Sequence, residues 1–355
     1  MNARLLGVLL VLLAALGGGA LLVFQQQGAR TVESGTLGQP LLKGLQAAQV
    51  AAIVIRTPKD AITIAKKDER WTIAERGGFP ADLEKVREFV VKAIALKIGQ
   101  SEPIGEKDRA RLLLDAGGTA IEFLGADGKP LAQLTAGRKY FKTEPENPEK
   151  ANGDGRYVML PGDDKRVVVV SDPLSQASTR SADWISKAGF AAEKVKAMEV
   201  RYADGASWKI ERSGDNADWK LGSARGDEKL DISKANAASY SLSLIELADV
   251  APADAKPEAT GLDQPLVVTA ATLDGLTYTL KIGKLSGENY YATVAISGEP
   301  KPEGKDAEER LKKINERLPR EKALAAFTLL IPKSKLDDMV KKRADLLARK
   351  EEKKK

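Results

Sequence analysis

The sequence contains no cysteine and no histidine in 355 residues. The absence of cysteine excludes disulfides, thiolate metal sites, a cysteine nucleophile and the lipid-modified cysteine of a bacterial lipoprotein. The absence of histidine removes the commonest general base, the commonest zinc ligand and the ordinary pH switch near neutrality. Most familiar catalytic mechanisms are therefore unavailable to this chain.

Sequence motifs for catalysis are missing as well. There is no Gly-x-Ser-x-Gly elbow, no Ser-x-x-Lys motif, no phosphate-binding Gly-x-x-x-x-Gly-Lys-Ser/Thr loop and no Gly-x-Gly-x-x-Gly turn. The adjacent pairs Ser186-Lys187 and Ser334-Lys335 have no supporting context. We therefore expect a protein that is not an enzyme, with no catalytic, cofactor-binding or metal-ligating residues and no cofactor.

A basic, nucleic-acid-binding surface is also not indicated. The net charge is +6, but residues 341–355 alone contain eight basic and three acidic residues, a balance of +5. The remaining 340 residues are nearly neutral, whereas a nucleic-acid-binding face needs Lys and Arg spread over a folded surface. We expect no nucleic-acid partner.

One long apolar run is present, from Leu5 to Phe24, without a charged side chain. Twenty residues in a helix rise about 30 Å, the thickness of the hydrocarbon core of a bilayer. The run predicts an N-terminal transmembrane helix that contacts the membrane through Leu5 to Phe24. A signal peptide cleaved after Ala20 is the alternative. Arg4 before the run predicts a single-pass protein of the bacterial inner membrane, with the bulk of the chain periplasmic.

The rest of the chain contains a pattern that occurs twice. Alternating strands, a hairpin with a tryptophan strand, and a helix opened by an aspartate recur at nearly constant separations, because Trp71 precedes Trp219 by 148 residues and Asp82 precedes Asp231 by 149. We expect an α+β fold: an N-terminal transmembrane helix followed by two duplicated modules of mostly antiparallel sheet, each with an inserted long helix. The helices should run from about Asp82 to Lys97 and from Asp231 through Leu247.

This pattern predicts five regions. They are an N-terminal membrane anchor (1–24), a polar linker (25–44), a first α+β module (45–190), a second α+β module (191–335) and a charged C-terminal helix or tail (336–355). Two polar insertions, Thr143 to Gly155 and Glu299 to Lys322, interrupt the modules, the second with a surface helix over Ala307 to Leu318.

Several of these stretches together resemble a known bacterial family, the domain of unknown function 4340 (DUF4340). They are the Trp71 strand, Phe-Pro-Ala-Asp at 79–82, Gly-Leu-Asp-Gln-Pro at 261–265, Leu-Lys-Ile-Gly at 280–283 and the Tyr157 strand. The resemblance extends from about residue 45 to 335, taken as two tandem copies. It implies an N-terminally anchored envelope protein associated with ABC-type transport systems of the gliding-motility auxiliary kind, and it supplies no catalytic residues.

A few individual residues could still carry chemistry. Trp71 and Trp219 could be ligand-stacking platforms, but their recurrence favours packing anchors. Asn152-Gly153-Asp154-Gly155 lacks the further carboxylates of a calcium loop and is typical of a turn. The neighbouring carboxylates Asp163-Asp164 and Asp337-Asp338 would need partners from elsewhere in the chain to act as an acid and a base.

The expected function follows from the anchor, the repeat and the resemblance. We expect a membrane-anchored, envelope-facing, non-catalytic binding or scaffold protein whose partner is an envelope protein, namely a subunit of an ABC-type transporter. The alternative is an envelope carboxylate-dependent hydrolase or glycan-binding protein that uses Asp154, Asp163 or Asp164.

Overall fold

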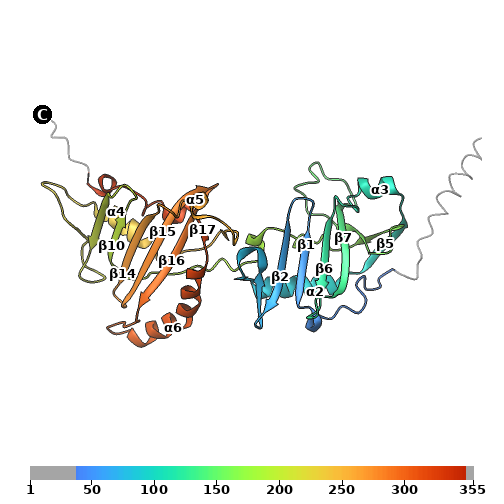
Figure 1. Cartoon of the computed structure of the whole chain (residues 1–355), viewed down its shortest axis with the longest axis horizontal. Coiled ribbons are helices and arrows are strands. Elements are labelled where there is room, and N and C mark those ends of the chain that lie inside the picture. Colours follow the sequence, from blue (N-terminus) through green and yellow to red (C-terminus); the bar gives the residue numbers. More distant parts are fainter. Residues whose placement is uncertain (1–36, 349–355) are drawn as a thin grey trace, which may run out of the picture. The chain divides into compact units, whose positions relative to one another are not determined.

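The computed structural model describes residues 37–348 (Figure 1), and these divide into two compact units. The first unit contains residues 37–69 and 83–179, and the second contains residues 70–82 and 180–348. The hairpin of residues 70–82 therefore belongs by its contacts to the second unit, although it precedes most of the first unit in the sequence.

The first unit is an antiparallel sheet with two helices. Its strands and helices are β1 (Ala52–Arg56), β2 (Ala61–Lys67), α2 (Leu83–Ala95), β5 (Ile98–Pro103), α3 (Glu106–Arg111), β6 (Thr119–Leu124), β7 (Pro130–Tyr140), β8 (Gly155–Met159) and β9 (Arg166–Val170), with a 3₁₀ turn η1 (Ala47–Gln49). The strands β2 and β6 bury alternate apolar residues, as expected for a sheet with one face against a core, whereas β1 between them buries Ile53, Val54 and Ile55 in succession.

The second unit contains an eight-stranded antiparallel sheet and four helices. The strands of this sheet are β10 (Val195–Arg201), β11 (Ser207–Glu211), β12 (Lys220–Leu221), β13 (Asp249–Val250), β14 (Leu266–Thr272), β15 (Leu276–Ser286), β16 (Asn289–Gly298) and β17 (Leu329–Pro332). The strands β3 (Arg70–Ile73) and β4 (Phe79–Pro80) lie within residues 70–82 and form the end of the other, nine-stranded sheet, beside β2. Its helices are α4 (Ile232–Tyr240), α5 (Pro257–Thr260), α6 (Ala307–Ala323) and α7 (Lys333–Leu336). Four 3₁₀ turns complete it: η2 (Ala74–Arg76), η3 (Ser181–Asp183), η4 (Leu324–Ala326) and η5 (Arg343–Leu346).

The two units have the same order of strands. The nine-stranded sheet has the order β4-β3-β2-β1-β6-β7-β8-β9-β5, and the eight-stranded sheet has the order β12-β11-β10-β14-β15-β16-β17-β13. The two orders match from β3 to β5 and from β12 to β13, and β4 is the one additional strand. In each unit a helix precedes the last strand of this order in the sequence, α2 before β5 and α4 before β13. The two halves of the chain therefore share one topology.

A glycine lies at a shift in strand register in both long strands, β7 and β15. The register shifts after Ala136 in β7 and after Ile282 in β15, and Gly137 and Gly283 follow directly. A Cβ atom at Gly137 would lie 2.2 Å from the carbonyl oxygen of Leu112, and one at Gly283 would lie 2.2 Å from that of Thr260. Only glycine permits this approach of the neighbouring segment to the bulge.

The helices α2 and α4 occupy equivalent places but differ in the size of their buried side chains. At the offset of 149 residues, Val86 and Phe89 of α2 correspond to Ala235 and Ala238 of α4, and all four are buried. Phe89 stacks on Phe123 with ring centroids 5.8 Å apart. The core beneath α4 is therefore built with smaller side chains than the core beneath α2.

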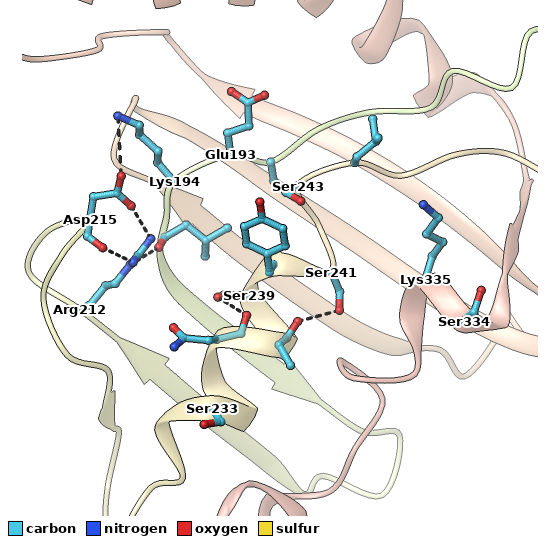
Figure 2. Close-up of a pocket in the computed structure, with 16 residues that line it drawn as sticks. Glu193, Lys194, Arg212, Asp215, Ser233, Ser239, Ser241, Ser243, Ser334 and Lys335 are labelled. Carbon is cyan, nitrogen blue, oxygen red and sulfur yellow. Dashed lines mark hydrogen bonds and ion pairs between the residues drawn. The ribbon is translucent and has the colours of Figure 1, made fainter. Parts of the chain in front are cut away.

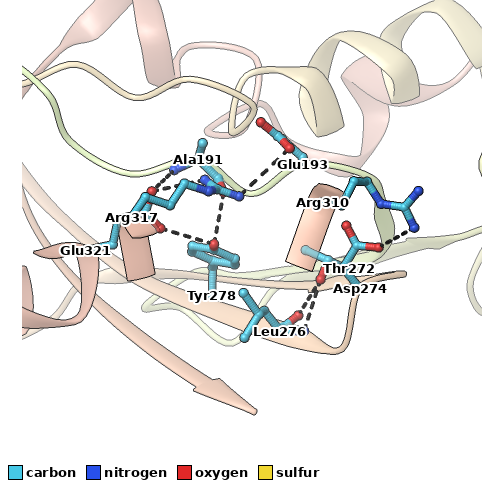
Figure 3. A network of polar contacts seen from close by, with 9 residues as sticks. All are labelled: Ala191, Glu193, Thr272, Asp274, Leu276, Tyr278, Arg310, Arg317 and Glu321. Atoms are coloured by element: carbon cyan, nitrogen blue, oxygen red, sulfur yellow. Dashed lines mark hydrogen bonds and ion pairs between the residues drawn. The ribbon is translucent and has the colours of Figure 1, made fainter. Parts of the chain in front are cut away.

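Helix α6 lies in the charged insertion and is fixed by a buried polar network (Figure 3). The Glu321 carboxylate, 1% exposed, accepts hydrogen bonds from the Ala191 N–H (3.2 Å) and from Arg317 (3.0 Å). The Tyr278 hydroxyl donates to the Ala191 carbonyl (2.9 Å), and Arg310 pairs with buried Asp274 at 3.1 Å. A surface helix was predicted over Ala307 to Leu318, and the observed helix buries Ile314 and Leu318.

The predicted α+β fold class is wrong. The structure consists mostly of two antiparallel sheets with few helices, because alternating sequences form long strands such as β15. The inserted helix of the second unit was predicted to reach Leu247 but ends at Tyr240. Ser239 and Ser241 hydroxyls donate to the carbonyls of Asn236 (3.0 Å) and Ala237 (2.9 Å), a competition that disfavours further helix.

The structure does not support the predicted transmembrane helix or the predicted single-pass localisation in the bacterial inner membrane. Across residues 37–348, every helix is too short or too polar to cross a membrane. The run Leu5 to Phe24, on which both predictions rested, lies outside the described residues.

Candidate binding site beside helix α4

A pocket of the second unit lies along one side of α4, with a cavity volume of about 1190 Å³ (Figure 2). Most of its lining comes from three parts of the chain, which are the start of β10 with the residues before it, the turn after β11, and α4 with the residues after it. Ser334 and Lys335 of α7 complete the wall. Figure 2 shows the helix serines between Arg212 and Asp215 on one side and Lys335 on the other.

Helix α4 is held by contacts at its N-terminus. The Asp231 carboxylate caps the helix by accepting from the N–H groups of Ser233 (3.0 Å) and Lys234 (3.3 Å). The Asp231 N–H donates to the carbonyl of Leu346 (2.9 Å) in the C-terminal segment. Leu346 is fully buried, so the C-terminal segment fixes the start of the helix that forms the pocket.

The wall opposite α4 is fixed by Arg212. Its Nε donates to the Val195 carbonyl at 2.8 Å, its Nη2 donates to Asp215 Oδ1 at 2.9 Å, and its guanidinium lies 4.8 Å from the centre of the Trp219 ring. Trp219 in turn donates from Nε1 to Asn236 Oδ1 of α4 at 2.9 Å. This chain of contacts connects the two walls beneath the pocket.

Every charged side chain of the pocket lining has an oppositely charged neighbour within the chain. Lys194 lies 3.8 Å from Asp215, which also pairs with Arg212. Lys335 lies 3.1 Å from Glu246, and Glu193 lies 3.9 Å from Arg317. The pocket is therefore close to electrically neutral as a surface.

We define the α4 face as Ser233, Asn236, Ala237, Tyr240 and Leu244, all of which line the pocket. Tyr240 is 78% exposed and Leu244 is 61% exposed, the two highest values among the exposed large apolar residues described. An exposed aromatic and an exposed leucine beside an open pocket are typical of a surface that binds another molecule.

The residues singled out from the sequence have mostly structural positions. Trp219 is 4% exposed, which confirms it as a packing anchor, and Trp184 and Trp208 are each 2% exposed. Trp71 is half-buried in β3. Of these, Trp219 lies next to the pocket through its bond to Asn236.

The carboxylates of the hydrolase alternative have separate partners. Asp154 Oδ2 accepts from the Lys142 N–H at 2.9 Å and closes a loop, and exposed Asp164 lies 3.4 Å from Arg109. Asp337 and Asp338 pair with Lys333 (2.6 Å) and Lys341 (2.5 Å). Within residues 37–348, histidine, cysteine, aspartate and glutamate side chains form no group of three that could hold a metal ion.

The pocket was not predicted, although the sequence carried a signal for it. Of the residues singled out, only Ser334 and Lys335 line it, and Lys335 is paired with Glu246 rather than with a serine. The signal is the composition of residues 232–247, which contain one Lys and one Glu in a chain that is 30% charged. What the pocket offers chemically is hydroxyl, amide and apolar surface, which suits binding.

The described residues form two antiparallel units, and the second unit has an open pocket beside α4. The chain matches the family described as Domain of unknown function (DUF4340) over residues 71–265, which is 195 of its 355 residues. The chain therefore belongs to the DUF4340 family. No curated protein and no solved structure matches it.

Proposed function

We propose that this DUF4340 protein is a non-catalytic binding or scaffold protein that holds a protein partner on the α4 face of its second unit. The observation that carries the proposal is the combined exposure of Tyr240 (78%) and Leu244 (61%) at the edge of an open pocket. Large apolar side chains in this setting are costly in water and favour contact with a partner.

Three further features support binding over catalysis. The serines of the pocket include two whose hydroxyls donate to helix carbonyls. The lining lysines and arginine are engaged with carboxylates. The network of Figure 3 holds α6 against Ala191, next to the pocket residues that start at Ala192, so the pocket wall is rigidly built.

The partner class that the family resemblance implies is a subunit of an ABC-type transport system. The test is co-purification of the tagged full-length chain from native cell extract, followed by identification of the bound proteins. The double variant Tyr240→Ser, Leu244→Ser should lose the partner, and the control Val91→Ser should retain it.

Val91 is a matched control because it is the equivalent of Tyr240 in α2 and is itself 53% exposed. Equal recovery of the partner by the double variant and by the unchanged chain would overturn the proposal. Recovery of a transporter subunit with the unchanged chain and with Val91→Ser, but not with the double variant, would support both the binding site and the partner class.

A further inference from the structure

The two units provide an internal comparison of the same helix face. In α2 the positions equivalent to Ser233, Asn236, Ala237 and Ser241 are Glu84, Arg87, Glu88 and Lys92. These four residues form two ion pairs, Arg87 with Glu84 at 3.1 Å and Lys92 with Glu88 at 2.8 Å. The positions that carry paired charges on α2 of the first unit therefore carry uncharged side chains on α4 of the second unit.

Loss of charge is a specific signal because the buried positions of the two helices correspond. Val86, Phe89 and Val90 of α2 are buried, and so are their equivalents Ala235, Ala238 and Ser239 of α4, at the same offset of 149 residues. The outward faces of α2 and α4 therefore occupy equivalent places in their units. Their difference in charge affects only how each face contacts solvent or a partner. Depletion of charge together with an exposed tyrosine is characteristic of the centre of a protein interface.

The charged side chains at the edge of the pocket sum to only +1, from Lys194, Arg212 and Lys335 against Glu193 and Asp215. These five side chains are paired internally, as described above, and include both signs. Binding a strongly acidic or basic segment would require breaking these pairs without compensation.

We propose, on the basis of the function above, that the α4 face takes an uncharged segment of its protein partner that places an apolar side chain between Tyr240 and Leu244. Charge complementarity selects this occupant, because the face has no charge and the charged side chains at its edge are already paired within the chain. Apolar contact and hydrogen bonds to hydroxyl and amide groups supply the recognition. The affinity consequently does not depend on ionic strength.

The test uses three synthetic helical peptides of about four turns with the same leucine and alanine face. The remaining positions are Gln in the first peptide, Glu in the second and Lys in the third. Binding to the full-length chain is measured by calorimetry at about 50 mM and about 500 mM NaCl, where the Debye length falls several-fold. The Gln peptide should bind saturably with a Kd that changes less than about twofold between these salt concentrations.

Variants of the α4 face give a second, independent readout. Ala237→Lys and Ala237→Glu should both weaken binding of the Gln peptide by about tenfold or more, because either charge is desolvated against an uncharged ligand. Tyr240→Ser should weaken it similarly, and Val91→Ser on the first unit should leave the Kd unchanged.

Several results would overturn this assignment of the occupant. They are no saturable binding of the Gln peptide, tighter binding of the Glu or Lys peptide that salt abolishes, or opposite effects of Ala237→Lys and Ala237→Glu. A disulfide-linked dimer of the Tyr240→Cys chain, which has no other cysteine, would instead assign the face to a second copy. None of these results would contradict co-purification of a protein partner that depends on Tyr240. The chemistry of the bound segment and the proposed function are therefore tested separately.

Discussion

At the scale of single residues, Glu321 shows how the second unit tolerates a buried charge. Its carboxylate is 1% exposed and accepts from Arg317 and from the Ala191 N–H. Burial raises the pKa of Glu321 above its ordinary value, in opposition to the attraction of Arg317. The same burial raises the pKa of the Tyr278 hydroxyl, which lies 3.4 Å from Glu321 Oε2.

Removal of this carboxylate should therefore be costly. Glu321→Ala leaves the Ala191 N–H and the Arg317 guanidinium without their acceptor, and should lower the free energy of unfolding by about 2–3 kcal/mol. Glu321→Gln keeps an acceptor oxygen and should cost less. Urea unfolding of both variants measures the difference, and equal stability of the alanine variant and the unchanged chain would refute the role of the network.

The same residue gives a pH dependence of known sign. Because the pKa of Glu321 is raised on folding, its contribution to stability is complete below the unfolded-state value of 4.5 and is lost as the pH rises through the folded-state pKa. The stability of the unchanged chain relative to Glu321→Gln should therefore decrease as the pH rises above 4.5. An increase of this stability difference with rising pH would contradict the burial argument.

At the scale of elements, α4 depends on its cap and on the C-terminal segment. Asp231→Ala removes acceptors for two N–H groups of the first turn and should lower the unfolding free energy by about 1 kcal/mol. Asp231→Asn retains a capping oxygen and should be close to neutral. Thermal unfolding of the two variants makes the comparison, and an unchanged midpoint for the alanine variant would show that the cap does not stabilise the helix.

The C-terminal segment is held near this cap by a two-point ion pair. Arg343 Nη2 lies 2.6 Å from Glu228 Oε2, and Arg343 Nε lies 3.3 Å from Glu228 Oε1. Arg343 lowers the pKa of Glu228 to about 2, with a further contribution from the Arg225 N–H. This pair therefore contributes stability above the ordinary pKa of 4.5 that is lost as the pH falls toward 2.

Arg343→Ala should move the pKa of Glu228 most of the way back toward 4.5. An NMR titration of the Glu228 carboxyl carbon measures it directly, with Arg201→Ala as a control on the same unit. A Glu228 that titrates near 4.5 in the unchanged chain would show that the pair does not form in solution.

The elements also show what the sequence could and could not predict. The alternating pattern predicted antiparallel strands such as β2, and the helix predicted from about Asp82 to Lys97 is α2, which spans Leu83–Ala95. The length of α4 was overestimated because serine hydroxyls compete for its carbonyls. The place of α6 could not be predicted, since its attachment depends on contacts with Ala191, Asp274 and Tyr278, which lie far from the helix in the sequence.

At the scale of the whole molecule, the common strand order of the two units is the main organising fact. Each unit can therefore serve as a reference for the other. Equivalent positions in α2 and α4 are buried alike, so a difference between their exposed residues points to a difference in function. The DUF4340 membership suggested by the Trp71 and Gly261 motifs is confirmed by the match over residues 71–265. The pocket was missed because its walls come from segments that the sequence does not show to be neighbours.

The central claim is that the uncharged α4 face of the second unit, and not its charged counterpart on α2, holds the protein partner. Since the chain has no cysteine, single variants Tyr240→Cys and Val91→Cys can each carry a maleimide benzophenone at equivalent, exposed positions. After irradiation in native cell extract, the account predicts a cross-linked protein adduct from position 240 and none from position 91. Adducts of equal yield at both positions, or an adduct at position 91 alone, would contradict it.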